Sequence, residues 1–190
     1  MSEEFKQINF DLFVEKLKKV GVDCDKLVEL YGEKIKNASF SVSNEDNNAY
    51  DGSLVNTILR ILTPNAVRIN EILPQGIKVD KNTIVKVCLL SHISKALRLI
   101  PNDNKWEVET RNLKYKFDTS LPSIRTGLHS IVMANECGIP FTAIEAEAMT
   151  IMDRDTEDKQ AKYFSSTLST IIKQANELTY LVLKNNNPKK

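Results

Sequence analysis

The segment 80-DKNTIVKVCLLSHISKALRLI-100 gives the clearest indication of the fold. Its apolar side chains fall on all sides of a 3.6-residue helical period, and a helix that is apolar all round is buried in the protein interior. Aspartate, as at position 80, is a preferred N-cap residue, because its carboxylate accepts hydrogen bonds from backbone N–H groups of the first helical turn. The sequence therefore predicts that residues 80–100 form the central, buried helix of a mainly α protein.

Amphipathic patterns on both sides of this stretch predict further helices. Glycine and proline mark several ends: Gly21 and Gly138 end helices, and Pro64 interrupts one. The sequence Thr142-Ala-Ile-Glu145 has the pattern of a capping box at a helix start. The predicted helices are 5–20, 27–35 after a cap at Asp23 or Asp25, 54–62, a short segment at 67–73, a helix from Ser120 or Ser123 to Cys137, 142–152 and about 159–183.

The period of the pattern changes from 3.6 to two between Pro101 and Pro122. Apolar and charged residues alternate over 105–110 and again over 113–117, around Arg111 and Asn112. Strict alternation of this kind is typical of half-buried strands joined by a turn. We therefore expect a β-hairpin at about 104–118, inserted into one helical domain that covers residues 1–190. Residues 37–52, rich in Ser, Asn and Asp, are expected to form a long loop.

Composition excludes several classes of protein. The chain has 190 residues, 42% of them hydrophobic, and its 26 Lys and Arg against 25 Asp and Glu give a net charge of +1. A dedicated nucleic-acid binder has a strong basic imbalance, so nucleic acid is not expected as a partner. No apolar run approaches the roughly 20 residues that span a bilayer, so no membrane is expected. A short basic tail is expected at about 184–190.

Cysteine and histidine usage gives no sign of a disulfide or metal framework. Cys24, Cys88 and Cys137 are odd in number and lack CxxC spacing, which favours a reducing, cytoplasmic location. His92 and His129 lack the spacing of a metal motif, and each is more readily explained as a packing or surface residue. The carboxylates at 153–158 are interspersed with basic residues and are more readily explained as helix caps. The residues alone thus leave an enzyme, a binding module and an assembly subunit open.

Several segments resemble, in chain order, motifs of one family. The segment 47-NNAYDGSLVN-56 is similar to HxAYxGGLxxH, and 89-LLSHISK-95 is similar to LLHDIGK. The segments 13–21, 121–130, 145–151 and 175–178 resemble the family's first helix, the region around its His-Gly pair, a later Glu-rich helix and its Ala-Asp-Glu-Leu ending. The family is the HD-domain superfamily, in particular the small phosphohydrolase-like proteins of bacteria and phages.

The resemblance implies a helical domain whose family members bind one or two divalent metals through His and Asp. In this chain, neutral or basic residues stand at most of the positions that match the family's metal ligands. Thr126 stands near one more of these positions. The resemblance therefore implies a pocket that needs no metal or other cofactor and no catalytic residue. The pocket residues would be Asn47, Tyr50, Asn56, Ser91, His92, Lys95, Arg154 and Asn176.

These observations favour the hypothesis that the protein acts by binding rather than by catalysis. One form of this hypothesis is a protein partner or homo-oligomer that contacts the hairpin and the loop before Gly52. The other is an anionic, nucleotide-type small molecule held by Lys95, Arg154 and Arg125.

Two alternatives remain. A metal-dependent phosphohydrolase would use His92, Asp51 and Asp153 or Asp155 as unusual ligands, acting on a nucleotide or another phosphate ester. The second alternative is an assembly subunit, which, if the chain is phage-encoded, would lie in the host cytoplasm or be virion-associated.

Overall fold

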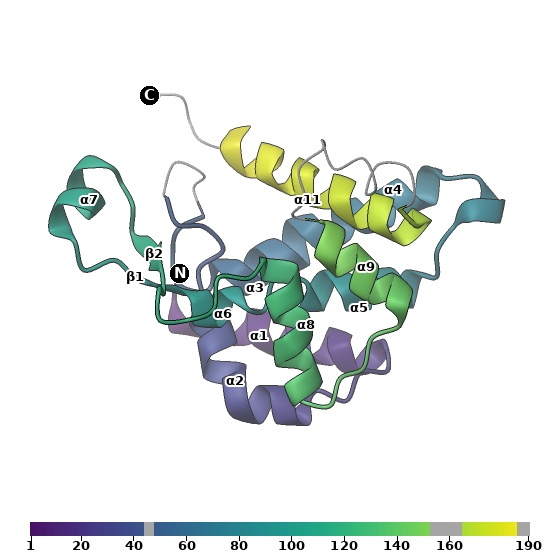
Figure 1. Ribbon diagram of the computed structural model, residues 1–190, viewed down its shortest axis with the longest axis horizontal. Helices are drawn as coiled ribbons and strands as arrows, with labels where there is room; N and C mark the ends of the chain where they lie inside the picture. The colour runs from purple at the N-terminus through teal and green to yellow at the C-terminus, as the bar shows by residue number, and fades with distance from the viewer. Residues whose placement is uncertain (44–47, 153–164, 186–190) are drawn as a thin grey trace.

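The computed structural model describes residues 1–43, 48–152 and 165–185, and these residues are mainly helical. Figure 1 shows α11 lying across α4 and α9 on one side, with α1 and α2 on the other side and α5 between them. A two-stranded sheet and α7 form an arm that extends from one end (Figure 1). The longer helices are α1 (Glu3–Lys19), α2 (Asp25–Asn37), α4 (Thr63–Ile72), α5 (Lys81–Leu90), α8 (Thr126–Glu136), α9 (Ala143–Ile151) and α11 (Thr167–Asn185).

The central helix is α5, as the sequence predicts. Its residues Ile84, Val87, Cys88, Leu89 and Leu90 are all fully buried. The helix contacts α1, α4, α8, α9 and α11, so apolar residues are needed on every side of it. Asp80 caps the helix by accepting a hydrogen bond from the backbone N–H of Thr83.

The prediction that this helix continues to residue 100 is wrong. It ends at Leu90, turns over 91–94, and resumes only as the short α6 (Lys95–Arg98). Ser91 Oγ donates to Cys88 O, and Ser94 Oγ donates to Thr126 O on another helix. Serine side chains that bond to backbone in this way compete with a continuing helix. Pro101 then favours extended backbone at Ile100, where the first strand lies.

Pro64 does not interrupt the helical path. The chain stays helical through α3 (Ser53–Thr57), a π-helical turn η2 (Ile58–Leu62) and α4. The N–H of Thr63 reaches back five residues to Ile58 O. Because the π turn widens the helix just before Pro64, the proline ring enters at the start of α4, where its missing N–H is tolerated.

The hairpin prediction is correct for its second strand and wrong for its first. Residues 105–110 form the helix α7 (Lys105–Thr110), because Asn104 Oδ1 accepts from the N–H groups of Trp106 and Glu107 as an N-cap. Strand β2 (Tyr115–Phe117) pairs antiparallel with β1 (Leu99–Pro101), and Leu99 lies opposite Phe117. The alternation of charged and apolar residues at 105–110 therefore belongs to a short helix without buried residues at the end of the arm, and not to a strand.

The loop before Gly52 is attached to this sheet. Tyr115 N donates to Val42 O, and Ser43 forms a bridge with Leu113. The phenol of Tyr115 also donates to Asp51 Oδ1 at 2.6 Å. The two segments that the sequence proposes as contact surfaces, the loop and the hairpin, are thus joined directly.

The remaining helix ends follow local signals. Thr142 and Glu145 form the predicted capping box at the start of α9, and Gly21 and Gly138 adopt left-handed backbone after α1 and α8. The predicted start of α8 at Ser120 or Ser123 is too early, because Asp118 accepts from Ser120 in a turn and the helix begins at Thr126. Residues 159–164 and most of the predicted tail lie outside the described residues. None of the helices within the described ranges is long and apolar enough to cross a membrane.

Candidate functional site

The structure brings together His92, Lys95 and Asn176 of the predicted pocket. His92 Nε2 lies 3.0 Å from Asn176 Oδ1, and both residues are buried. Asn176 Nδ2 donates to Met152 O, so Asn176 Oδ1 is the acceptor and His92 Nε2 carries the proton. Burial lowers the pKa of His92 well below its usual value, and the nearby Lys95 lowers it further. His92 is therefore neutral at neutral pH.

Lys95 is buried beside His92, and its partners are neutral. Its ammonium donates to Phe40 O at 2.8 Å and to the hydroxyl of Tyr180 at 3.1 Å. The same ammonium lies 3.6 Å from the centroid of the Phe40 ring, and that ring meets His92 edge-on. Lys95 thus holds the loop at Phe40 and the helix at Tyr180 together, through charge-assisted hydrogen bonds and a cation–π contact.

The other predicted pocket residues lie in different surroundings. Ser91 is fully buried and bonds to the backbone of α5. Asn56 donates to the hydroxyl of Tyr50 and accepts from Asn9, apart from the His92 group. Asp51 accepts from Tyr115 at the sheet. Asn47, Asp153, Arg154 and Asp155 lie outside the described residues.

The His92 group does not have the donor set of a divalent-metal site. His92 Nε2 is committed to Asn176, whose side chain is a neutral amide, and the Lys95 ammonium adds positive charge. Within residues 1–43, 48–152 and 165–185, no three His, Cys, Asp or Glu side chains form a group that could hold a metal ion. The described residues around His92 therefore do not fit a divalent-metal centre.

An open pocket lies at the base of the arm, beside Arg98, which follows Lys95 by one turn of α6. It is lined by Arg98, Phe117, Ser123, Ile124, Arg125 and Thr126, and its volume is about 340 Å³. A second hollow of about 390 Å³ shares Arg98, Phe117 and Ser123 and extends toward Asp118 and Leu121. Both volumes lie at the lower end of the range for small-molecule sites. We call this combined hollow the Arg98 pocket.

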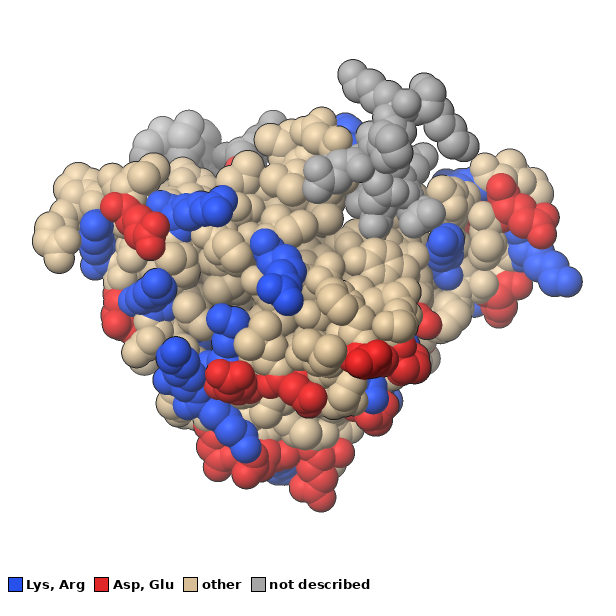
Figure 2. All heavy atoms as spheres, turned by 180° about the vertical axis from the view of Figure 1, so that it is seen from behind, with Lys and Arg blue, Asp and Glu red and all other residues tan. Residues whose placement is uncertain are grey.

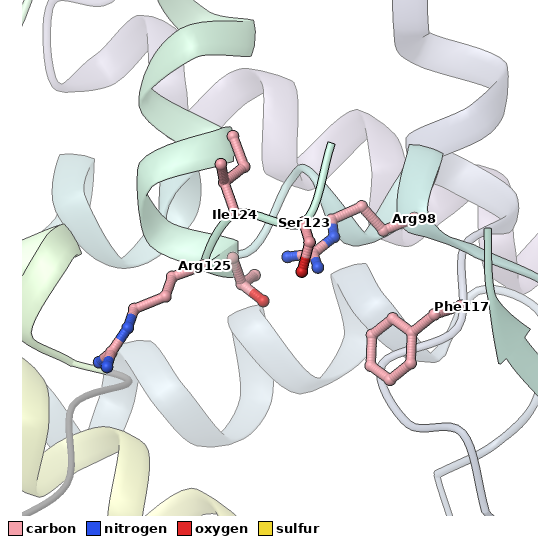
Figure 3. Close-up of a pocket in the computed structure, with 6 residues that line it drawn as sticks. Arg98, Phe117, Ser123, Ile124 and Arg125 are labelled. Atoms are coloured by element: carbon pink, nitrogen blue, oxygen red, sulfur yellow. The ribbon is translucent and has the colours of Figure 1, made fainter. Parts of the chain in front are cut away.

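The sheet positions the two principal side chains of the Arg98 pocket. Because Leu99 pairs with Phe117, Arg98 lies opposite Asp118, and Asp118 N donates to Arg98 O at 2.8 Å. The Arg98 guanidinium carbon lies 5.6 Å from the centroid of the Phe117 ring. Figure 3 shows the Arg98 side chain in the pocket that Ser123 and Phe117 also line, with the Phe117 ring on the side of the strand. The Arg125 side chain extends away from Arg98 and Phe117 (Figure 3).

The wall that carries Ser123 is fixed to the protein core. Ser94 Oγ donates to Thr126 O, and Ser130 Oγ donates to Ser94 Oγ. Gly127 permits α8 to pack directly on α9, since a Cβ there would lie 1.8 Å from Met149 O. The start of α8 is therefore held firmly beside α6.

Arg98 has no ion pair with a carboxylate in the described part of the chain, although it is half-buried. The nearest acid along the sheet, Asp118, turns its carboxylate toward Ser120, which lowers the pKa of Asp118. Elsewhere opposite charges are mixed: Figure 2 shows Lys and Arg beside Asp and Glu over much of the opposite face. The Arg98 guanidinium is thus a cation in an open pocket that Phe117 and Ser123 also line, and the Asp118 carboxylate, which bonds to Ser120, borders only the second hollow.

Comparison of the chain with protein-family models, curated proteins and solved structures found no match. The sequence reasoning did not find the Arg98 pocket, because it placed Arg98 inside a continuous helix. A usable signal was present in Leu99-Ile-Pro101, since a branched apolar residue before proline favours extended backbone.

Proposed function

We propose that the protein acts by binding an anionic ligand in the Arg98 pocket, on an HD-domain-like helical scaffold that does not use a metal. The observation that carries the proposal is the half-buried Arg98 guanidinium, which lies in an open pocket without a carboxylate partner among the described residues. Arginine presents five N–H donors in a planar fork that matches the oxygens of phosphate or carboxylate. An anion would supply acceptors for the guanidinium N–H groups, which donate to no acceptor among the described residues.

The side chains around Arg98 are consistent with this role. Ser123 lines the same pocket and adds a hydroxyl donor, and the arm and α8 supply two walls. Hydrogen bonds to charged groups contribute about 1.5–3 kcal/mol each when solvent is displaced. The pocket therefore has the charge and the donors for one phosphate or carboxylate group.

Titration with inorganic phosphate, followed by calorimetry and by NMR of backbone amides, tests this proposal. Arg98→Gln keeps hydrogen-bonding capacity and removes the charge, and we expect it to weaken binding by about 10-fold or more. Arg68→Gln removes an exposed arginine from α4 and serves as the matched control. The absence of phosphate binding to the wild-type protein, or equal binding by Arg98→Gln, would contradict the proposal.

The metal-free part of the proposal has its own test. It is supported by His92, whose Nε2–H is donated to a neutral amide beside a lysine. Elemental analysis of the purified protein would overturn it by finding stoichiometric iron, manganese or another transition metal. In that case the metal-dependent phosphohydrolase alternative would be favoured, and phosphate release from nucleotides with Mn²⁺ should disappear in His92→Ala.

A second candidate function is self-association through the arm. Trp106 lies on α7, at the end of the arm far from the helices of the body, and 60% of its surface is exposed (Figure 1). Exposed tryptophan is a frequent anchor of protein interfaces. Light scattering after size exclusion would show an oligomer that Trp106→Ala reduces to a monomer; a wild-type protein that is monomeric at all concentrations would exclude this candidate.

A further inference from the structure

The Arg98 pocket contains a feature that an anion alone does not explain. Phe117 is 55% exposed although it belongs to a strand, and its ring borders both hollows of the pocket. Its pairing partner Leu99, by contrast, is buried. A phenylalanine ring contributes a large apolar surface, and leaving it in water forgoes the stabilisation that burial would give. The ring is therefore available to a ligand.

The position of the ring relative to Arg98 limits the kind of ligand. The guanidinium carbon lies 5.6 Å from the ring centroid, so a group bound to Arg98 lies directly beside the ring face or edge. A second ring stacked on Phe117 would have its centroid about 4.5–7 Å away. One ligand reaches both sites if its anionic group is attached to its ring directly or through one or two atoms.

Apolar residues also line the hollow that extends from Phe117. Leu121, which is half-buried, and Pro122 border the second hollow together with Phe117, whereas the Ile124 side chain extends away from Arg98 and Phe117 (Figure 3). Strand pairing fixes Phe117, because Leu99 lies opposite it and Asp118 N donates to Arg98 O. The pairing thus keeps the backbone of Phe117 next to that of Arg98, so that both side chains extend into the same pocket.

We infer that the ligand of the Arg98 pocket is a compact aromatic anion, in which a phosphate or carboxylate is attached close to a planar ring. Arg98 and Ser123 bind the anionic group, and Phe117 stacks on the ring. This inference rests on the proposed anion site and specifies the chemistry of its ligand. A long spacer between ring and anion would place the ring beyond Phe117.

Three probes of related charge separate the contributions. Phenyl phosphate, cyclohexyl phosphate and inorganic phosphate share the phosphate group, but only phenyl phosphate has a π face. We expect the wild-type protein to bind phenyl phosphate about 3- to 10-fold more tightly than cyclohexyl phosphate, because stacking adds to area burial. Benzoate and cyclohexanecarboxylate repeat the comparison for a carboxylate and show which anionic group the site prefers.

Phe117→Leu tests the role of the ring, since it keeps apolar surface on the strand but removes the π face. We expect this variant to bind phenyl and cyclohexyl phosphate equally, with the affinity for inorganic phosphate unchanged. Trp106→Leu is the matched control, because it removes an exposed ring that lies on the arm but does not line the pocket. It should leave the preference for phenyl phosphate intact.

The outcomes distinguish the two proposals. If the wild-type protein binds phenyl and cyclohexyl phosphate equally, or if Phe117→Leu keeps the preference, the aromatic inference is wrong while the anion site stands. If none of the phosphates or carboxylates binds, the anion site itself is wrong. A folded state is confirmed for each variant by its circular dichroism spectrum and unfolding midpoint, so a loss of binding is not attributed to unfolding.

Discussion

His92 Nε2 lies 3.0 Å from Asn176 Oδ1, although 84 positions separate the two residues in the chain. This hydrogen bond joins the turn after the central helix to the last described helix. Asn176 also donates to Met152 O, so a single amide bonds to both the His92 turn and the end of α9. His92 Nδ1 is buried and has no hydrogen-bond partner within the described residues. The pair therefore fixes one tautomer of a neutral histidine.

The first prediction concerns acid stability. The pKa of folded His92 is lowered, so below the unfolded-state pKa of about 6.5 the unfolded chain binds a proton that the folded chain does not. The free energy of unfolding should then fall as the pH falls, by up to about 1.4 kcal/mol per pH unit from this group. Urea unfolding at pH 7.5, 6.5 and 5.5 measures this.

His92→Gln should flatten this dependence. Burial and Arg98 also lower the pKa of His129, so the comparison is best made in a His129→Gln background. An unchanged slope in His92→Gln would show that another group is responsible for the acid sensitivity.

The second prediction concerns the Asn176 amide. Asn176→Leu fills a similar volume but leaves the His92 N–H and Met152 O without a partner, and each unsatisfied buried group costs about 1–3 kcal/mol. The free energy of unfolding should fall by at least about 2 kcal/mol. Asn185→Leu, on the exposed end of the same helix, is the control and should change it by less than about 0.5 kcal/mol. Similar losses in both variants would contradict a structural role for the amide.

The third prediction concerns the contact between α8 and α9. A methyl group on Gly127 would overlap Met149 O, so Gly127→Ala must separate the two helices and should cost about 2–3 kcal/mol. Gly76→Ala is the control, because no atom lies within 4 Å of the added carbon. Thermal unfolding should show a marked loss for the first variant only. Since α8 carries one wall of the Arg98 pocket, phosphate affinity should fall with it.

The fourth prediction concerns a partly buried ion pair. Lys86 lies 3.0 Å from Glu145, which also accepts from Thr142 N in the capping box. Glu145→Ala removes the partner of Lys86 and the cap together and should cost about 3 kcal/mol. Glu145→Gln keeps an oxygen for the cap and should cost less, about 1–2 kcal/mol. Denaturant unfolding of the two variants separates charge from capping; equal losses would assign the effect to charge alone.

Local signals predicted the helices well and the arm poorly. The caps that involve Asp80, Thr142 and Glu145 bond to N–H groups within one helical turn. They can therefore be recognised from a few consecutive residues of the sequence. The alternation at 105–110 suggested a strand, but Asn104 caps a helix there instead. Six residues carry too little periodicity to separate the two structures when neither face is buried.

The predicted pocket was only partly assembled. His92, Lys95 and Asn176 come together because the turn after the central helix, the start of α6 and the last described helix face the same core. Asn56 instead donates a hydrogen bond to the hydroxyl of Tyr50, and the Ser91 hydroxyl donates to Cys88 O of the central helix. Spacing along the chain could not distinguish these outcomes, since each depends on how separate helices cross.

The mainly helical class, the buried central helix and the caps that begin the helices follow from the amino-acid sequence, because they depend on periodicity and on contacts within a few residues. The end of the central helix at Leu90, the pairing of Leu99 with Phe117, and the meeting of Arg98, Phe117 and Ser123 depend on contacts between distant segments. Strand pairing and helix packing join residues that are distant in the chain, and their free energy depends on the whole set of partners rather than on any one segment.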